Sequence, residues 1–176
     1  NHIEGFMKRL GILLVLLFAI SGCSSWGDFS FKSDTFGYKM NFPETWEVLD
    51  RCDGSSDHLI ANVPDDKFSE IVVTAQKVSP DVGASEIYLR FLDGGNDAVL
   101  YNDFVILEKG TISARNQEGR FIKTEFVKDK EPMQGMSAKF LGNRFTLEIK
   151  AISNEDMYVV HETDFRKMIS LIQFRS

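Results

Sequence analysis

The chain contains little cysteine and little proline. Its 176 residues include two cysteines, Cys23 and Cys52, and four prolines. If Cys23 is chemically modified, Cys52 has no partner within the chain, so the domain must be stable without a disulfide. The prolines fall between patterned stretches, as turn residues do.

Histidine is also scarce, and this limits the possible active sites. A Ser-His-Asp or Cys-His site would have to use His58 or His161, because His2 precedes the mature domain. The stretch "HETDF" begins like a zinc-protease helix, but Phe165 occupies the position of the second histidine. The sequence has no G-x-S-x-G motif, no Walker loop and no G-x-G-x-x-G. We therefore predict no catalytic residue, no bound metal and no cofactor, and a protein that is not an enzyme.

Basic residues are also fewer than acidic residues in this chain. The net charge of the chain is −6. Removal of residues 1–22 takes away Lys8, Arg9 and Glu4, and the charge then becomes −7. An acidic domain lacks the basic surface that nucleic-acid binding requires, so we expect no nucleic-acid partner.

The chain lacks an apolar run long enough to span a membrane. Lys8 and Arg9 precede an apolar stretch, Leu10–Ile20, and the small residues Ser21 and Gly22 follow it. A spanning helix needs about 20 apolar residues. Positive charge, a short apolar stretch and small residues are the order found in a secretory signal. Residues 7–22 are therefore predicted to be a signal peptide, and residues 1–6 lie upstream of it.

The cysteine that follows suggests how the protein is held. "AISGC", Ala19–Cys23, resembles the lipobox of bacterial lipoproteins, which implies cleavage before Cys23 and acylation of its sulfur. The alternative is an ordinary signal peptide with an incidental cysteine. Two or more acyl chains anchor a protein stably. The resemblance therefore implies an exported lipoprotein in the cell membrane or the outer membrane, with residues 23–33 as a tether.

Alternating apolar residues predict strands in most of the remaining chain. The clearest is "NRFTLEIKAI", where Phe145, Leu147 and Ile149 alternate with polar residues. Similar stretches cover residues 37–43, 45–49, 58–63, 69–78, 104–113, 119–127 and 135–141. "LGN", Leu141–Asn143, predicts a hairpin turn. Short polar turns between strands indicate a mainly antiparallel sheet.

Two helices interrupt the strands. The first spans residues 83–95, with Ser85 as a candidate cap; "LDGGND", Leu92–Asp97, has no phosphate-loop lysine and indicates its end. A second part, residues 96–104, extends or follows this helix. The other helix is C-terminal, where Phe165, Met168, Ile169 and Ile172 form one apolar stripe that must pack on the sheet. Ser153 and Thr163 are its alternative caps.

These motifs resemble those of PsbP-like domains. "FGYKMNFPETWEV", Phe36–Val48, is similar to the opening of that family, and "FVILEKGTISARNQEGR" and "FRKMISLIQF" to its middle and its end. The resemblance implies an α+β fold over residues 34–176, an αβα sandwich around a central, mainly antiparallel sheet with the C-terminal helix packed on it. The best-known member is an extrinsic, non-enzymatic photosystem subunit, but nothing in this sequence matches a photosystem-binding segment.

One loop contains the residues that we consider for ligand binding. "DRCDGSSDHL" contains Asp50, Asp53, Asp57 and His58, a candidate ligand or cation loop, and Cys52, which with His58 would make a nucleophile. The aspartate spacing differs from an EF-hand, and a solvated acidic turn with an idle thiol is the simpler interpretation. Asp65 and Asp66 are likewise interpreted as a solvated turn.

Two hypotheses of function remain. The first is a lipid-anchored, exported, non-catalytic binding or assembly module, attached to the membrane through Cys23 and engaging a protein partner in the envelope. The alternative is a small-molecule or divalent-cation binding protein of the cell envelope, with the Asp50–His58 loop lining its site.

Overall fold

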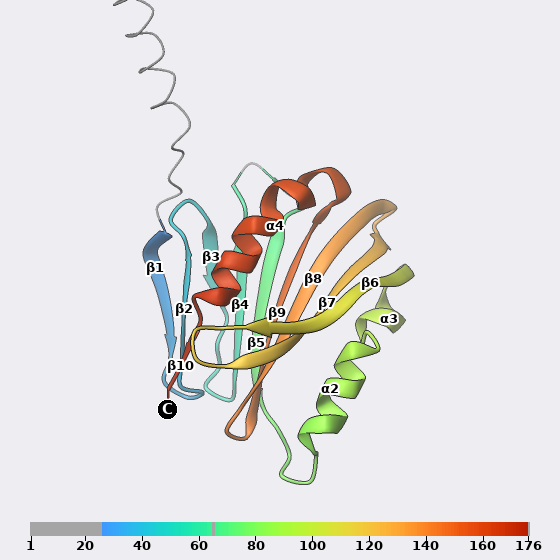
Figure 1. Cartoon of the computed structure of the whole chain (residues 1–176). Helices are drawn as coiled ribbons and strands as arrows, with labels where there is room; N and C mark the ends of the chain where they lie inside the picture. Colours follow the sequence, from blue (N-terminus) through green and yellow to red (C-terminus); the bar gives the residue numbers. More distant parts are fainter. Residues whose placement is uncertain (1–25, 65, 176) are drawn as a thin grey trace, which may run out of the picture.

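The computed structural model describes residues 26–64 and 66–175 of the chain (Figure 1). Strands account for most of these residues, as the alternating pattern predicts. The elements in chain order are β1 (Trp26–Ser33), β2 (Tyr38–Pro43), β3 (Glu47–Asp50), β4 (Ser56–Asn62), β5 (Glu70–Lys77), α2 (Ala84–Leu92), α3 (Asp97–Leu100), β6 (Asn102–Ser113), β7 (Glu118–Lys128), β8 (Glu131–Gly142), β9 (Phe145–Asn154), α4 (Glu155–Ser170) and β10 (Gln173–Phe174).

The described strands form two sheets in which neighbours run antiparallel. One has three strands in the order β1-β2-β10, and the other has seven in the order β3-β4-β5-β9-β8-β7-β6. Hairpins join most neighbours in the larger sheet. The neighbours β5 and β9 are the exception, because α2, α3 and three strands separate them in the chain. The mainly antiparallel sheet expected from the sequence is confirmed, and a small second sheet accompanies it.

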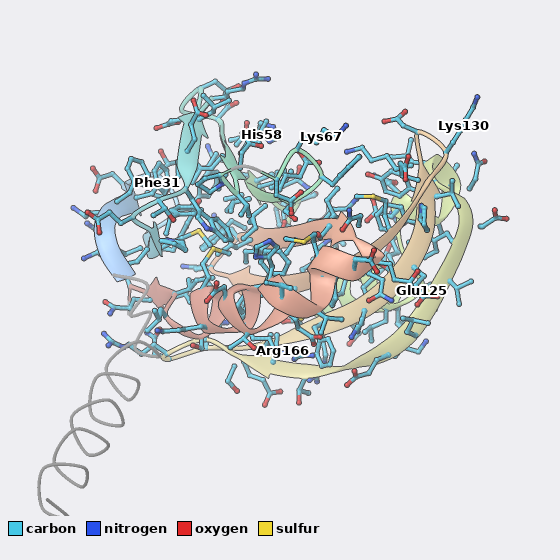
Figure 2. The ribbon with its side chains drawn as sticks, turned by 90° about the horizontal axis from the view of Figure 1, so that it is seen from above. Phe31, His58, Lys67, Glu125, Lys130 and Arg166 are labelled. Carbon is cyan, nitrogen blue, oxygen red and sulfur yellow. The ribbon has the colours of Figure 1, made fainter. Side chains whose placement is uncertain are left out.

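One face of the larger sheet is covered by α4 and β2. The fully buried Phe165 and Met168 of α4 share a core with Leu147 and Ile149 of β9 and with Met40 of β2. Because strand side chains alternate between faces, every second residue of β9 reaches this core. Figure 2 shows the sheet curving around α4, which lies inside the curve.

The other face of the larger sheet is covered by α2 and α3. Lys139 of β8 places its Nζ 5.1 Å from the ring centre of Phe91 in α2. Lys150 of β9 lies over the ring of Tyr101, which directly follows α3, at 4.4 Å. Helices therefore lie on both faces, and the expected αβα sandwich with a C-terminal helix on the sheet is confirmed.

The helix ends differ in part from the sequence predictions. Asn154 caps α4 by accepting a hydrogen bond from the Met157 amide at 2.9 Å, so neither Ser153 nor Thr163 is the cap. Ser153 is the penultimate residue of β9 and is fully buried, which removes its side chain from the helix end. The first helix, α2, has Gly83 at its N-cap, and Ser85 lies inside it.

The prediction that residues 23–33 are a tether is wrong for Trp26–Ser33, which form β1. This strand pairs with β2, with Phe31 opposite Met40. The rings of Phe29 and Phe31 lie beside those of Phe42 and Tyr38, both at 5.9 Å between ring centres. Their spacing of two residues is the spacing of a strand. Only residues 23–25 remain as a possible linker, and they lie outside the described residues.

The last hairpin turn also lies slightly further along the chain than predicted. β8 continues to Gly142 and β9 begins at Phe145, so the turn is Asn143–Arg144 rather than Leu141–Asn143. Arg144 has a φ of 64°, a left-handed conformation that is unusual for arginine. The sequence placed a turn here correctly, but its residues are set by the register of the two strands.

Candidate functional site

The predicted lipid attachment site, Cys23, lies outside the described residues, and acylation stays a prediction. The first described residue, Trp26, follows it by three positions. Within the described ranges, no helix has both the length and the apolar character needed to cross a membrane.

The aspartates of the predicted ligand loop are occupied by local hydrogen bonds. Asp53 Oδ1 accepts from the Ser55 and Ser56 amides at 2.9 and 2.8 Å and from the Ser55 hydroxyl at 2.8 Å. The Ser55 hydroxyl and these amides lower the pKa of Asp53 to about 2. Asp50 Oδ1 accepts from the Cys52 amide at 2.9 Å. Both carboxylates therefore stabilise the turn between β3 and β4, as a solvated acidic turn does.

Asp57 and His58 point to opposite faces of β4, because they are consecutive residues of one strand. Asp57 is 4% exposed and faces the core, and its Oδ2 has no hydrogen-bond partner. Burial and the nearby Asp57 charge raise the pKa of Tyr38 well above its ordinary value. The part of the chain that is described contains no group of three or more His, Cys, Asp or Glu residues able to hold a metal ion. The structure therefore does not bring Asp50, Asp53, Asp57 and His58 together as a cation site.

Cys52 does not have the environment of a nucleophile. Its side chain is half-buried and packs against the main hydrophobic core. Burial, together with a hydrogen bond involving Asp50, raises the pKa of the thiol to about 12. Because the thiolate is the reactive form, a thiol that stays protonated at neutral pH is inert. The simpler interpretation of the Cys52–His58 pair agrees with this environment.

A polar cluster that the sequence analysis did not identify joins the β4–β5 loop to β9 and α4. Asp66 accepts hydrogen bonds from the Ser69 hydroxyl and, at 3.0 Å, from the Phe68 amide, and its Oδ2 lies 3.4 Å from His161 Nε2. The Ser69 hydroxyl lies 2.6 Å from that of Ser153. Burial alone would raise the pKa of Asp66, but these hydrogen bonds and the adjacent His161 side chain lower it.

This cluster corrects the interpretation of Asp66 as a residue of a solvated turn, because its side chain is only 10% exposed. The Asp66 carboxylate stands between the Ser69 hydroxyl and the His161 imidazole. A hydrolase triad needs the imidazole next to the hydroxyl so that it can take the proton. The Asp66–His161 cluster is therefore suited to fixing a loop, and its members come from three separate segments that sequence motifs do not connect.

A cavity of about 570 Å³ lies between the α2–α3 segment and the larger sheet. The buried hydroxyl residues Ser137 and Thr146 line it from β8 and β9. Lys139 and Glu148 line it beside them, with Lys139 Nζ 2.6 Å from Glu148 Oε2. We call this the α2–α3 cavity. Polar and charged residues make up most of its lining, and Ile87, Phe91 and Ile122 are among its apolar residues.

Within the described residues, a half-buried ion pair holds α3 over this cavity. Lys150 Nζ lies 2.7 Å from Asp97 Oδ1, the first residue of α3, and 3.1 Å from the Tyr101 hydroxyl. Burial alone would lower the pKa of Lys150, but Asp97 and Tyr101 raise it. Lys150 therefore stays charged at neutral pH, and its contacts with Asp97 and Tyr101 tie the helical segment to the sheet.

Comparisons with known proteins identify the fold. No family model matches the chain, and no curated protein matches it. The solved structure of cyanobacterial PsbP (CyanoP) from Synechocystis sp. PCC 6803 is similar, at 12% identity and a TM-score of 0.66, over 89% of this chain and 96% of that one. LpqN of Mycobacterium tuberculosis, described as involved in cell envelope biogenesis, matches at 12% identity and 0.61, over 84% and 91%.

The yeast Ran-binding protein Mog1p from Saccharomyces cerevisiae is similar as well. It matches at 8% identity and a TM-score of 0.54, over 85% of this chain and 96% of that one. At such low identity these similarities establish the fold and leave the activity open. The chain has the PsbP-like α+β fold that its sequence motifs suggested.

Proposed function

We propose that this chain is an exported lipoprotein of the cell envelope, attached to the membrane by acyl chains on Cys23, and that its domain is a non-catalytic binding or assembly module. The observation that carries the proposal is the sequence Lys8–Cys23, in which a charged start, an apolar stretch and small residues end at a cysteine. The description of the similar LpqN structure as involved in cell envelope biogenesis supports a role in the same compartment.

The geometry of β1 fits a short anchor. Trp26 follows Cys23 by three residues, and three extended residues span about 10 Å. An acylated Cys23 would thus hold the start of β1 close to the membrane surface. In Figure 1 this is the upper end of β1. The acidic domain would be weakly repelled by anionic headgroups, so attachment would depend on the acyl chains.

The polar groups of the domain support a non-catalytic role. The Asp66–His161 cluster fixes a loop, Asp53 stabilises a turn, and the Cys52 thiol is protonated at neutral pH. The α2–α3 cavity and the exposed outer faces of the helices would then provide contacts for a ligand or partner.

The anchor can be tested with two cysteine variants. Cells expressing the wild-type chain are grown with an alkyne-tagged fatty acid, and the protein is fractionated and examined by mass spectrometry. We expect the wild type to carry acyl label in the membrane fraction, and Cys23→Ser to lose the label and the stable attachment. Cys52→Ser is the matched control and should keep both. An unlabelled wild type, or a Cys23→Ser variant that stays acylated, would contradict the proposal.

The α2–α3 cavity favours a second candidate function, the binding of a small zwitterion such as a free amino acid. Lys139 and Glu148 present one positive and one negative group at the cavity wall, and Ser137 and Thr146 add buried hydroxyls. Calorimetric titration with the free amino acids tests this. Ser137→Leu should abolish any binding by filling the cavity. The absence of saturable heat with every amino acid would exclude this candidate and leave the anchor proposal unaffected.

A further inference from the structure

The end of the molecule opposite to the start of β1 contains a second cavity, of about 520 Å³. Its walls come from the turn between β1 and β2, the segment that follows β5, the turn between β8 and β9, and the C-terminal residues Phe174 and Arg175. In Figure 1 the C-terminus and the β8–β9 turn both lie at the lower end of the molecule. We call this the lower cavity.

The lower cavity is cationic although the whole chain is acidic. Lys77, Arg144 and Arg175 line it, and no aspartate or glutamate is found among the described residues of its wall. Arg175 lies 3.3 Å from Asp34, whose side chain is 80% exposed and also contacts Lys32 at 3.1 Å. Within residues 26–64 and 66–175, Lys77 and Arg144 form no ion pair with a carboxylate. Cations therefore gather at this cavity although the chain has a net charge of −6.

Aromatic side chains line the lower cavity beside these cations. Phe36, Phe145 and Phe174 are each less than 10% exposed and belong to three different segments. The ring centres of Phe36 and Phe145 are 5.4 Å apart, and those of Phe145 and Phe174 are 6.4 Å apart. Cations next to an apolar surface match a ligand that has both an anionic group and a ring or short hydrocarbon.

Hydrogen bonds between the walls hold the lower cavity open without a ligand. Gln117 Nε2 donates to the Leu141 carbonyl at 2.6 Å, which positions the β8–β9 hairpin. Asn116 Nδ2 donates to the Phe174 carbonyl at 2.7 Å, and the Phe174 amide donates back to Asn116 Oδ1 at 2.9 Å. A site whose walls are fixed in this way loses less entropy when it binds a ligand.

Arg144 occupies a position in its turn where glycine would be favoured. It is the second residue of a two-residue turn and has a φ of 64°, and its carbonyl accepts from the Val78 amide at 3.0 Å. Left-handed backbone is unfavourable for residues other than glycine and collects at functional sites. The arginine at this position places a guanidinium at the rim of the cavity, which a glycine would not.

We infer that the lower cavity binds a small organic anion, whose phosphate or carboxylate group lies among Arg144, Lys77 and Arg175 and whose apolar part rests on Phe36, Phe145 and Phe174. Charge-assisted hydrogen bonds from arginine suit both anionic groups. β1 separates this cavity from Trp26 by roughly 25 Å, the length of eight extended residues. If Cys23 is acylated, the cavity faces away from the membrane and takes a soluble anion rather than a lipid headgroup. The inference concerns the folded domain and stands whether or not the sulfur is acylated.

Calorimetric titration of the full-length protein in non-ionic detergent tests this inference. The probes are phenyl phosphate and sodium benzoate, which separate phosphate from carboxylate, with inorganic phosphate for the charge alone and benzyl alcohol for the ring alone. We expect saturable binding of phenyl phosphate or benzoate. Whichever of these two anions has the higher affinity should also bind more tightly than inorganic phosphate and benzyl alcohol. Failure of both organic anions to saturate, or equal binding of benzyl alcohol, would overturn the inference.

Two glycine variants separate binding from folding. Arg144→Gly removes the rim cation and relieves the left-handed backbone, so affinity should fall roughly tenfold or more while the thermal midpoint holds or rises. Lys130→Gly is the matched control: Lys130 has a φ of 72° in the β7–β8 turn, outside the lower cavity. It should leave affinity unchanged. An equal loss of affinity in both variants, or no loss in Arg144→Gly, would refute the assignment.

Discussion

The ion pair between Lys150 and Asp97 makes a prediction that can be worked out from the structure. Lys150 Nζ lies 2.7 Å from Asp97 Oδ1, and the two side chains are only 16% and 20% exposed. Nζ also contacts the Tyr101 hydroxyl at 3.1 Å and lies 4.4 Å from the centre of the same ring. We expect Lys150→Met to keep the packing of the aliphatic stem and to remove every one of these polar contacts.

The size of the effect follows from three contributions. A hydrogen bond to a charged group contributes about 1.5–3 kcal/mol, and a cation over an aromatic ring about 0.5–1 kcal/mol or more. The cost of removing Lys150 from water cancels part of this gain. We therefore expect Lys150→Met to lower the free energy of unfolding by about 2 kcal/mol, and Asp97→Asn to lower it by about 1 kcal/mol. Because the two residues contact each other, the double variant should show a coupling energy of about 0.5–1 kcal/mol.

Urea unfolding of the wild type, both single variants and the double variant measures this coupling. The pH dependence gives a second check. The pKa of Lys150 is raised in the folded state, so its contribution is fully present below the unfolded pKa of about 10.4 and is lost as pH rises through the folded pKa. The stability difference between wild type and Lys150→Met should therefore shrink in strong alkali. A coupling energy below about 0.3 kcal/mol at neutral pH would refute the reasoning.

Three further predictions concern the sheet and the core. Asp66→Asn should lower the free energy of unfolding by about 1–2 kcal/mol at pH 7. Because the folded pKa of Asp66 is depressed, the difference from wild type should vanish in acid unfolding curves as pH falls below that pKa. Phe165→Ala should cost about 3–5 kcal/mol in urea unfolding, since this fully buried ring meets Trp46 and Tyr158 at 6.0 Å. Gly119→Ala should lower the thermal midpoint, because an added Cβ would lie 2.5 Å from the Lys139 carbonyl oxygen; an unchanged midpoint would contradict this geometry.

Regular patterns in the sequence predicted most of the secondary structure. The alternation of Phe145, Leu147 and Ile149 correctly identified β9, because a strand with one buried face repeats every two residues. The stripe of Phe165, Met168, Ile169 and Ile172 correctly predicted the C-terminal helix, and all four residues are fully buried. Ile172 lies beyond α4, however, because the helix ends at Ser170.

Errors arose where a short segment depends on a distant partner. Trp26–Ser33 contains three aromatic residues, of which only Phe29 and Phe31 alternate, and it resembles a linker until β2 is present to pair with it. Neither predicted cap of α4, Ser153 or Thr163, is the observed one. Because β9 runs directly into the helix, the register of β9 assigns Ser153 to the sheet and Asn154 to the cap.

The candidate sites could be predicted from the sequence less well than the secondary structure. Asp50, Asp53, Asp57 and His58 are close in the chain, but the turn occupies the first two and the alternation of β4 separates the last two. By contrast, Lys77 and Arg144, both in the wall of the lower cavity, lie far apart in the sequence, and no spacing rule connects them.

Composition and local patterns are sufficient to predict the strand-rich character of the domain, its C-terminal helix, its acidic charge and the signal-like start that ends at Cys23. These features depend on local periodicity or on composition, which a single chain displays directly. Three features are visible only in the folded chain: Asp66 lies against His161, Asp97 secures α3 to the sheet, and cations line the lower cavity. Each of those features joins segments that are brought together only by the pairing of strands and the packing of helices. No local pattern in the sequence therefore predicts them.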